Sequence, residues 1–247
     1  MKAAAVIVSA GRGHRFPGGK KKQFLSLAGK PILCYALDSF EGCPSIDLIH
    51  LVVGEEDMEY TLREIVEPYQ YRKIAQVVPG GEQRQDSVKM GIDTLGPEID
   101  LVAIHDGVRP FVTREMIEGS LQEARQFKAC VVAVPVKETI KRVGPGRVVL
   151  KTLDRESLWQ IQTPQTFQLP VFQKALRQAE ADRFVGTDDA SLVERIGVEV
   201  HILPGSYDNI KITTPEDLIW AHLILEKEQK GQKGRNGHGE ASVPGEG

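Results

Sequence analysis

The N-terminal segment restricts the possible folds of this chain more than any other feature. An apolar run at residues 3–8 leads directly into Ser9-Ala10-Gly11-Arg12-Gly13-His14-Arg15, and three lysines follow at residues 20–22. A buried strand that ends in small residues lets backbone N–H groups approach an anion closely, and fixed positive charges just beyond it neutralise a polyphosphate. The chain therefore begins with the pattern of a nucleoside triphosphate site at the end of a buried strand.

Two familiar phosphate-binding loops do not fit this segment. The dinucleotide fingerprint needs a third glycine three residues after Gly13, where the chain has Phe16. The P-loop needs Gly-Lys followed by Ser or Thr, but Gly19-Lys20 is followed by Lys21. A plain strand and turn with surface lysines therefore stays open at this point as the alternative to a phosphate site.

Composition limits the class of protein. The 247 residues suit one large α/β domain, and a net charge of −3 argues against a general nucleic-acid binder. The three cysteines are odd in number and form no Cys-x-x-Cys pair, which favours a reduced setting over a disulfide framework. The first apolar run is too short for a signal peptide or a membrane span, so we expect a cytoplasmic protein with no membrane partner.

The remaining apolar runs alternate with helical patterns. Nearly continuous β-branched runs suit strands buried on both faces. Such runs occur at 3–8, 48–53, 74–78, 101–104, 130–134 and 198–203. Helices are expected at 31–40, 56–67, 82–95, 114–127, 169–181 and 187–196, with a last helix from Thr214-Pro215 to about 227–230. The alternation predicts an α/β fold with a Rossmann-like, mostly parallel sheet and helices on both faces.

A second pattern interrupts this alternation after Pro135. Two β-type segments at 138–143 and 147–152 flank Gly144-Pro145-Gly146, which predicts an inserted β-hairpin arm within about residues 136–158. Two strands alone bury too little to be stable, so the arm must pack on a second subunit or lie as a flap on its own domain. We expect one domain over 1–230 and a disordered, dispensable tail over 231–247.

Asp106 follows the strand expected at 101–104, within His105-Asp106-Gly107-Val108-Arg109-Pro110. In open α/β sheets ligands bind outside the carboxyl ends of the strands, and a carboxylate beside a triphosphate recruits Mg²⁺. The alternative is a turn cap ahead of Pro110. His105 has no partners at metal-ligand spacing, so we expect it to be structural rather than a zinc ligand.

Two glycines precede the helix expected at 82–95. Gly80 and Gly81 free the backbone at a helix N-terminus, where N–H groups are unpaired. Arg84 and Ser87 lie three residues apart, which places them on one side of the first turn, where a base, a ribose or a phosphate can be contacted. A surface arginine on an ordinary helix N-terminus is the alternative.

Shorter motifs carry less information singly. Lys211 lies in a strand-like run before the last helix, Asp154-Arg155 and Thr163-Pro164-Gln165 flank Trp159, and Thr187-Asp188-Asp189 opens a helix. Each such motif is more often a helix cap or a solvated charge than a site. The chain has no Gly-x-Ser-x-Gly motif and no cysteine beside a cation, so covalent catalysis is not predicted.

Eight motifs occur together in one order. They are Ser9-Ala10-Gly11-x-Gly13-x-Arg15, Lys22-Gln23, Gly80-Gly81-x-x-Arg84-x-x-Ser87, Asp106-x-x-Arg109-Pro110, Asp154-Arg155, Thr163-Pro164-Gln165, Thr187-Asp188-Asp189-Ala190-Ser191 and Asp208-Asn209-Ile210-Lys211. In this register the chain resembles the 2-C-methyl-D-erythritol 4-phosphate cytidylyltransferase family over about residues 2–226. One motif is unspecific, but the whole series is specific.

The resemblance implies a nucleotide-diphospho-sugar transferase type of fold and a Mg²⁺-dependent transfer of CMP from CTP to 2-C-methyl-D-erythritol 4-phosphate, which releases pyrophosphate. It implies that Asp106 handles Mg²⁺ and the CTP phosphates. The implied catalytic residues are Arg15, Lys22, Arg155 and Lys211. Those implied for the CTP site are Ser9, Ala10, Gly11, Gly13, Gly80, Gly81, Arg84, Ser87, Asp106 and Gly107. Those implied for the acceptor are Arg109, Thr139, Arg155, Thr163, Thr187 and Lys211.

The resemblance also implies a homodimer that exchanges the arm, so that Thr139 and Arg155 serve the neighbour's site. The chain departs from the family pattern in three places. Ser9 stands where alanine is frequent, Gly107-Val108 replaces Ala-Ala, and Lys21 stands where a proline commonly precedes the catalytic lysine. The last departure leaves open which of the three lysines faces the site.

Three other functions are weighed against this one. A ribitol-5-phosphate cytidylyltransferase, or another sugar-phosphate nucleotidyltransferase, shares the same architecture. An NAD-dependent oxidoreductase needs the missing third glycine and an acid after the second strand, where Glu55 or Glu56 stands. A non-catalytic nucleotide sensor would keep the glycine loops but would not need Arg109, Arg155 and Lys211 to converge.

Overall fold

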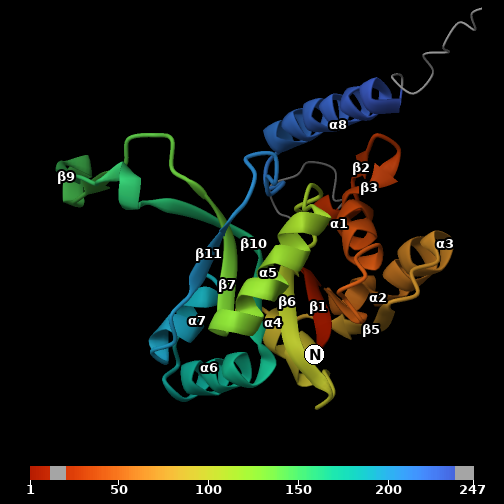
Figure 1. Ribbon diagram of the computed structural model, residues 1–247, viewed down its shortest axis with the longest axis horizontal. Coiled ribbons are helices and arrows are strands. Elements are labelled where there is room, and N and C mark those ends of the chain that lie inside the picture. Colours follow the sequence, from red (N-terminus) through yellow and green to blue (C-terminus); the bar gives the residue numbers. More distant parts are fainter. Residues whose placement is uncertain (12–20, 237–247) are drawn as a thin grey trace, which may run out of the picture.

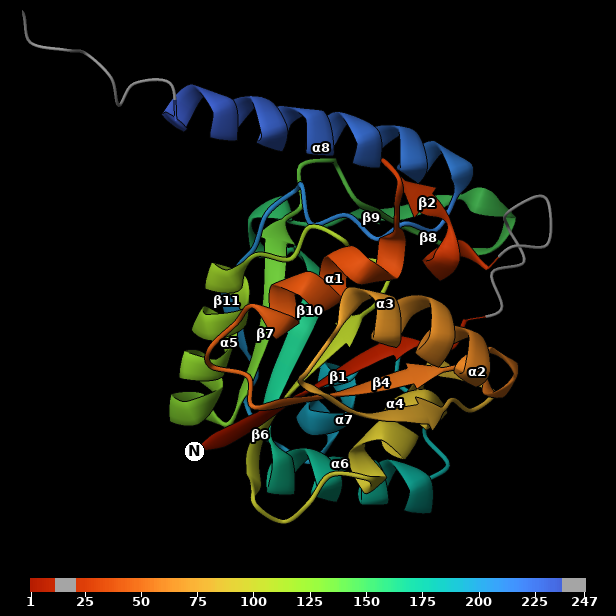
Figure 2. The same ribbon diagram turned by 90° about the vertical axis from the view of Figure 1, so that its right-hand side faces the viewer.

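The computed structural model describes residues 1–11 and 21–236, with the backbone alone for residues 231–236. Its centre is a seven-stranded sheet with the order β11-β7-β10-β6-β1-β4-β5 (Figure 2). The strands are β1 (Lys2–Ser9), β4 (Leu48–Val53), β5 (Ile74–Pro79), β6 (Ile99–Asp106), β7 (Ala129–Pro135), β10 (Trp159–Gln168) and β11 (His201–Pro204). All run parallel except β10, which is antiparallel to β6 and β7. The predicted mostly parallel α/β sheet is confirmed.

Helices cover both faces of this sheet, as predicted (Figure 2). One face carries α1 (Ile32–Glu41) and α5 (Arg114–Phe127), and the other carries α4 (Arg84–Asp93), α6 (Leu169–Ala181) and α7 (Ala190–Arg195). Successive side chains of β1 point to opposite faces, so Ile7 packs in one hydrophobic cluster and Val6 in the other. Burial on both faces explains why the β1 sequence is a continuous apolar run.

β10 was not predicted as a strand. Its sequence is polar, yet Gln162, Thr163, Gln165 and Thr166 are buried between β6 and β7. Side-chain hydrogen bonds satisfy these residues, and Pro164 lies where the pairing with β7 shifts register, a position at which a ladder tolerates proline. A hydrophobic pattern cannot find such a strand, because its inner residues are selected for hydrogen bonding rather than for apolar burial.

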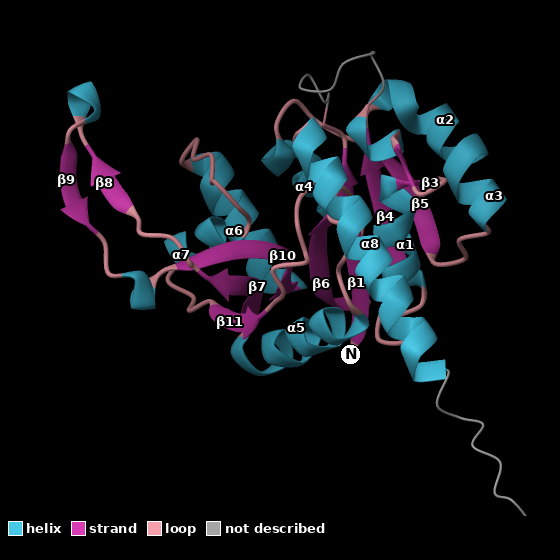
Figure 3. Cartoon of the chain, turned by 90° about the horizontal axis from the view of Figure 1, so that it is seen from above, coloured by secondary structure: helices cyan, strands magenta, loops and turns pink. Residues whose placement is uncertain are grey.

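The predicted arm extends the β7–β10 pair beyond the sheet. Its small sheet pairs β8 (Lys141–Val143) with β9 (Val149–Thr152), and short 3₁₀ turns η4 (Pro145–Arg147) and η5 (Arg155–Ser157) follow each strand. Figures 1 and 3 show the arm projecting away from the body of the chain. The predicted strands at 138–143 and 147–152 are therefore shorter in the structure.

Several helix boundaries differ from the prediction. The helix expected at 56–67 is η2 (Glu55–Asp57), α2 (Met58–Thr61), a π-helical segment η3 (Leu62–Val66) and α3 (Glu67–Tyr69). α4 and α7 begin two and three residues later than predicted, which frees Gly80–Gln83 and Thr187–Asp189 as loops at the end of the sheet. β11 likewise begins at His201 rather than at 198.

The last helix, α8 (Pro215–Asn236), begins at the predicted proline. The Asp217 carboxylate accepts hydrogen bonds from the backbone N–H groups of Thr213 and Thr214, which stabilises this start. The helix continues past Lys230 to Asn236, so its expected end at about 227–230 is wrong, because Gln232, Lys233 and Arg235 are good helix formers and extend it despite Gly231 and Gly234. Residues 237–247 lie outside the described part. No helix in residues 1–11 and 21–236 has the length and apolar character needed to cross a membrane.

The residues before α1 form a short connection that bears on the site. It contains η1 (Lys22–Phe24), β2 (Ser26–Leu27) and β3 (Lys30–Pro31). Ile32 and Leu27 pack with Ala221 of α8 in a third hydrophobic cluster above the sheet edge. This cluster holds α8 over the carboxyl ends of the strands (Figure 1).

Candidate active site

Four parallel strands end side by side at one edge of the sheet. Ser9, the last residue of β1, pairs with Val53 at the end of β4, and Val53 pairs with Pro79 at the end of β5. Asp106, the last residue of β6, pairs with Val8. The segments that follow these strands therefore converge over one edge, which is where open α/β sheets bind ligands.

A cavity of about 200 Å³ lies over this edge, between β1, η1 and the start of α4. We call it the glycine-loop cavity. The predicted residues that line it are Ser9, Ala10, Gly11, Lys22, Gly81, Arg84, Ser87, Asp106 and Lys211. Val8, Gln23, Glu82, Gln83 and Val108 also line it, although no role was predicted for them. Gly13, predicted for the CTP site, and Arg15, predicted to be catalytic, lie outside the described residues.

Gly80 and Gly107 were predicted to contact the nucleotide, but neither lines the cavity. At both positions neighbouring residues pack closely against the backbone. A Cβ on Gly80 would lie 2.3 Å from Ala10 Cβ, and a Cβ on Gly107 would lie 2.8 Å from Leu33 Cδ1 and 3.0 Å from Ser9 Oγ. Gly80 therefore has no room for a side chain beside Ala10, whereas an alanine at Gly107 would need only a small shift of the flexible Leu33 side chain.

The wall also presents an unsatisfied polar atom. Ser9 Oγ is buried and has no hydrogen-bond partner in the described part of the chain. An unpaired buried hydroxyl is unfavourable, so it is usually satisfied by water or by a ligand. Ser9, which replaces the alanine frequent in related sequences, therefore provides one more polar group for a ligand of this cavity.

A second cavity, of about 480 Å³, adjoins the first on the side of β10. We call it the β10 cavity. Four residues predicted to hold the acceptor meet here, namely Arg109, Thr163, Thr187 and Lys211. Ile161, Gln162, Gln165, Asp188, Ser191 and Glu194 complete the lining. Arg84, Asp106 and Lys211 line both cavities, so the two share a wall of charged side chains.

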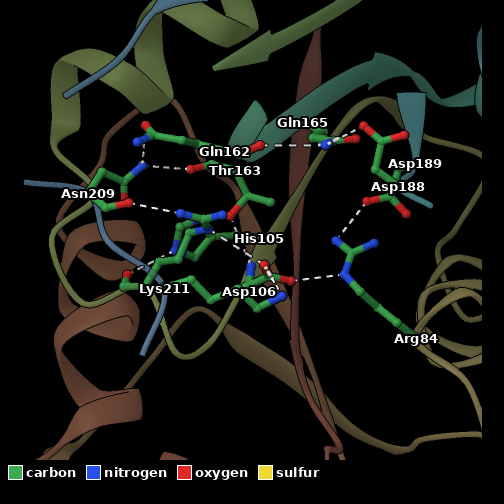
Figure 4. A network of polar contacts seen from close by, with 11 residues as sticks. Arg84, His105, Asp106, Gln162, Thr163, Gln165, Asp188, Asp189, Asn209 and Lys211 are labelled. Atoms are coloured by element: carbon green, nitrogen blue, oxygen red, sulfur yellow. Dashed lines mark hydrogen bonds and ion pairs between the residues drawn. The ribbon is translucent and has the colours of Figure 1, made fainter. Parts of the chain in front are cut away.

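Asp106 is the centre of this shared wall (Figure 4). Its carboxylate lies 2.9 Å from Arg84 Nε and 2.9 Å from Lys211 Nζ, and 3.6 Å from Arg109 Nε. Burial alone would raise the pKa of Asp106, but the positive charges of Arg84, Lys211 and Arg109 outweigh it and hold the pKa well below its usual range. Asp106 is therefore an ionised carboxylate at neutral pH.

A second buried carboxylate holds Arg84 from the other side. Arg84 Nη2 donates to Asp189 Oδ2 at 2.8 Å, and Asp189 is nearly fully buried. Burial raises the pKa of Asp189, and the Arg84 guanidinium only partly offsets this effect. The neighbouring Asp188 accepts hydrogen bonds from Gln165 and from the backbone of Ser191, so it caps α7. Asp188 is thus a helix cap, the ordinary interpretation of this motif, whereas Asp189 also holds Arg84.

His105 lies behind Asp106 and is fully buried. Its Nε2 donates to the backbone carbonyl of Arg109 at 3.1 Å, which leaves Nδ1 as the acceptor of the Thr163 hydroxyl at 2.9 Å. The same Thr163 oxygen accepts the backbone N–H of Asp106 at 3.1 Å. Burial lowers the pKa of His105 to about 4, so the ring is neutral and orients Thr163.

The loop that carries Lys211 is fixed to β10. Asn209 is buried and donates to Gln162 Oε1 and to the backbone carbonyl of Thr163, at 3.2 and 3.0 Å. The backbone carbonyl of Asn209 accepts from Arg109 Nη1 at 2.8 Å. These bonds hold the backbone near Lys211 at the edge of both cavities, and the ion pair with Asp106 holds its ammonium group.

The three lysines expected near the site do not play the same part. Lys22 lines the glycine-loop cavity, whereas Lys21 points to the opposite side and pairs with the carboxylates of Glu56 and Asp57. Glu56, which the oxidoreductase hypothesis needs at a nucleotide site, pairs with Lys21 and lines neither cavity, which weighs against that hypothesis. Lys20 lies outside the described residues.

Thr139 and Arg155 are on the arm and line neither cavity of their own chain. Thr139 is exposed, and Arg155 Nη1 donates to the backbone carbonyl of Lys137 at 2.9 Å. The structure therefore does not bring these two predicted residues together with the rest of the site in one chain.

The donor set suits a metal ion that arrives with a phosphate ligand rather than a resident metal centre. In residues 1–11 and 21–236 no three His, Cys, Asp or Glu side chains gather as metal ligands. Asp106 is the carboxylate that reaches both cavities. Mg²⁺ is commonly bound by one or two carboxylates together with substrate phosphates, so this single carboxylate fits a Mg²⁺–nucleotide complex.

Comparison with known proteins agrees with this geometry. Residues 3–227 match the family model of 2-C-methyl-D-erythritol 4-phosphate cytidylyltransferase. Relatives of that name from Caldanaerobacter subterraneus and Halalkalibacterium halodurans are 45% and 46% identical, over 92% and 93% of this chain and 100% of each relative. The crystal structure of 4-diphosphocytidyl-2C-methyl-D-erythritol synthase from Anaerococcus prevotii is 32% identical, with a TM-score of 0.82 over 91% of this chain and 96% of that one. The chain therefore belongs to the 2-C-methyl-D-erythritol 4-phosphate cytidylyltransferase family.

Proposed function

We propose that this chain is a nucleotidyltransferase that transfers CMP from CTP to 2-C-methyl-D-erythritol 4-phosphate. The products are 4-diphosphocytidyl-2-C-methyl-D-erythritol and pyrophosphate. The observation that carries the proposal is the pair of adjoining cavities that share Arg84, Asp106 and Lys211. Two anionic ligands placed in them meet at one cluster of fixed charge. Family membership supplies the identity of the two substrates.

The two cavities divide the substrates between them. CTP belongs in the glycine-loop cavity, where Gly81 and the N-terminus of α4 favour a polyphosphate and Ser9 Oγ is unpaired. The acceptor belongs in the β10 cavity, where Thr163, Thr187 and Arg109 provide hydroxyls and a guanidinium for a sugar-alcohol phosphate. In this assignment the acceptor phosphate would meet the nucleotide at Lys211, which lines both cavities.

The chemical step is an in-line displacement. An oxygen of the acceptor phosphate forms a bond to the α-phosphorus of CTP, the bond to the bridging oxygen of the β-phosphate breaks, and pyrophosphate leaves with that electron pair. The acceptor is already an anion at neutral pH, so no strong general base is needed. The barrier is the approach of two anions, which Lys22 and Lys211 lower by neutralising charge on the non-bridging oxygens. Arg15 is proposed to act with them.

The cations around Asp106 prepare the site for this charge. Arg84 and Lys211 are held by the Asp106 carboxylate in the described structure, so they are in place before a phosphate arrives. Preorganised charges need no reorganisation during the reaction. Mg²⁺, held by Asp106 and the CTP phosphates, would supply further charge neutralisation at those phosphates.

A homodimer completes the proposed site. Val143, Val148, Val149 and Leu150 of the arm are each more than half exposed, and an apolar hairpin of this kind is unstable in water without a partner surface. Exchange of the arm would cover these side chains and carry Thr139 and Arg155 to the β10 cavity of the neighbour. The three free cysteines, all buried, are in keeping with the proposed cytoplasmic location.

The proposal is tested by pyrophosphate release. The full chain is assayed with CTP and Mg²⁺ and with 2-C-methyl-D-erythritol 4-phosphate or ribitol 5-phosphate as the acceptor. We expect the methylerythritol phosphate to give the higher kcat/KM. Preference for ribitol 5-phosphate would overturn the assignment of the acceptor, and no release with either would overturn the proposed function.

A further inference from the structure

Two adjacent lysines of this chain have opposite surroundings. Lys22, at the start of η1, lines the glycine-loop cavity, and Lys21 immediately before it points to the segment that follows β4. The backbone of Lys21 is extended, with φ −69° and ψ 135°, which turns its side chain away from that of the next residue. The chain thus places one lysine in the cavity and one behind it.

The Lys21 side chain is held by two carboxylates. Its Nζ donates to Asp57 Oδ2 at 2.6 Å and also bonds Glu56 Oε1. The side chains of Lys21 and Asp57 are only 19% and 13% exposed, so this contact is largely shielded from water. An ion pair in such surroundings holds its geometry better than one on the open surface.

Further contacts fasten the other side of Lys22. Gln23 is buried, and its Nε2 donates to the backbone carbonyls of Ser9 and Gly11 at 2.9 and 3.4 Å. The Phe24 ring meets the Tyr60 ring of α2 edge to face, with centroids 4.9 Å apart. The backbone of Lys22 is therefore flanked by one tether to the end of β1 and another to the segment after β4.

We propose that Lys21 is a positioning residue. Its ion pairs with Glu56 and Asp57 clamp the backbone of η1 against η2, and the clamp keeps the Lys22 ammonium in the glycine-loop cavity. The inference rests on the proposed function, because Lys22 acts on the reaction only if a polyphosphate binds there. It assigns a role to the position at which this chain departs from the family pattern.

The first test compares steady-state kinetics of the full chain with Lys21→Met and Lys21→Arg. Methionine keeps the length of the side chain and removes its charge. We expect Lys21→Met to lower kcat about 10- to 100-fold, since a small displacement of a catalytic group is costly, while KM for the acceptor changes little. Lys21→Arg retains the ion pairs and should restore most of the rate. Asp57→Asn should reproduce the loss.

The second test asks whether Lys21 acts through Lys22. In a Lys22→Ala background, Lys21→Met should lower kcat by less than about 2-fold further, because no ammonium remains to be positioned. Lys89→Met is the matched control, since it removes another lysine ion pair, with Asp93 at 2.7 Å, from an exposed surface. It should leave kcat unchanged, and thermal melting of every variant reports whether the fold is intact.

Two results would overturn the inference. One is a wild-type kcat for folded Lys21→Met, and the other is a double variant in which the two losses multiply in full. Failure of the proposed function gives a different result, because the wild-type chain itself would then release no pyrophosphate. In that case the clamp is judged on the Kd for CTP from calorimetry, which Lys21→Met should raise about tenfold in the wild-type background and not in Lys22→Ala. An unchanged Kd would again overturn it.

Discussion

The carboxyl edge of the sheet and the hairpin arm differ in how many partners their key side chains find within one chain. At the edge, Asp106 is surrounded by Arg84, Lys211 and Arg109 within 3.6 Å. On the arm, Thr139 is exposed and lines neither the glycine-loop cavity nor the β10 cavity of its own chain. The apolar Leu150 is 56% exposed.

The difference suggests separate tasks: the edge is organised for the reaction, and the arm is organised for contact with another chain. A cluster of buried charges in one chain is organised before any ligand binds, and such preorganisation is what a reaction between two anions requires. The hairpin that projects from the body instead leaves apolar side chains exposed to water, which is typical of a surface used for assembly. In the function proposed above, the edge supplies the reacting groups, and the arm makes the site depend on a second copy of the chain.

The largest expected effect removes a cation from the edge. Lys22→Ala and Lys211→Ala should each lower kcat about 10²- to 10³-fold, because each removes charge aimed at the transferring phosphoryl group. Pyrophosphate release measures the loss. Lys227→Ala, which removes an exposed lysine paired with Asp208, is the matched control and should retain full activity. Near-normal turnover of either edge variant would exclude that lysine from the mechanism.

A somewhat smaller effect is expected on the arm. Arg155→Ala should lower kcat/KM for the acceptor about 10- to 100-fold and leave KM for CTP nearly unchanged, since the proposal gives Arg155 a charged hydrogen bond to the acceptor phosphate. Arg142→Ala, an exposed arginine on the same arm, should have no effect. Equal losses in the two variants would mean that the arm acts through its general charge.

Loss of the second carboxylate should sharpen the account of the edge. Asp189→Asn removes the charge that holds Arg84 Nη2 at 2.8 Å but leaves Asp106 on Nε. We expect kcat/KM for CTP to fall about tenfold, with a modest decrease in the melting temperature. Asp182→Asn, which breaks the exposed pair with Arg195, serves as the control. An unchanged kcat/KM would show that Asp106 alone orients Arg84.

The smallest effect concerns stability and pH. His105 has a folded pKa of about 4, below its usual value of 6.5, so the unfolded chain takes up the proton first as the pH falls. The contribution of neutral His105 to the free energy of unfolding is fully present above pH 6.5. It is lost between pH 6.5 and about 4, where the free energy of unfolding falls by up to about 1.4 kcal/mol per pH unit from this group. Urea unfolding of the wild type and of His105→Gln across this range measures it, and parallel curves would refute the assignment.

The sequence pattern correctly predicted those strands and helices whose own residues carry a clear apolar run or helical period. β4, α5 and α6 have the bounds expected from sequence, because a continuous apolar run or a helical period marks their whole length. β10 could not be found in this way, since its buried glutamines and threonines take partners from β6, α7 and the Lys211 loop.

The site residues show the same contrast between what neighbouring sequence reveals and what distant contacts decide. Motif order located Lys22, Asp106 and Lys211, which do line one cavity. The role of Asp189 was not foreseen, because its partner Arg84 lies 105 residues away in sequence. The direction of Lys21 was not foreseen either, since it depends on carboxylates 35 and 36 residues along the chain.

Mixing two impaired variants, one changed at the edge and one on the arm, tests most directly whether each site is built from two chains. Lys22→Ala and Arg155→Ala are co-expressed, the mixed dimers form statistically, and pyrophosphate release is measured. If the edge of one chain works with the arm of its partner, each mixed dimer contains one intact site, and the mixture should recover about one quarter of wild-type activity. If Arg155 serves its own chain, every site in the mixed dimer lacks one group, and activity no higher than that of the separate variants would contradict the account.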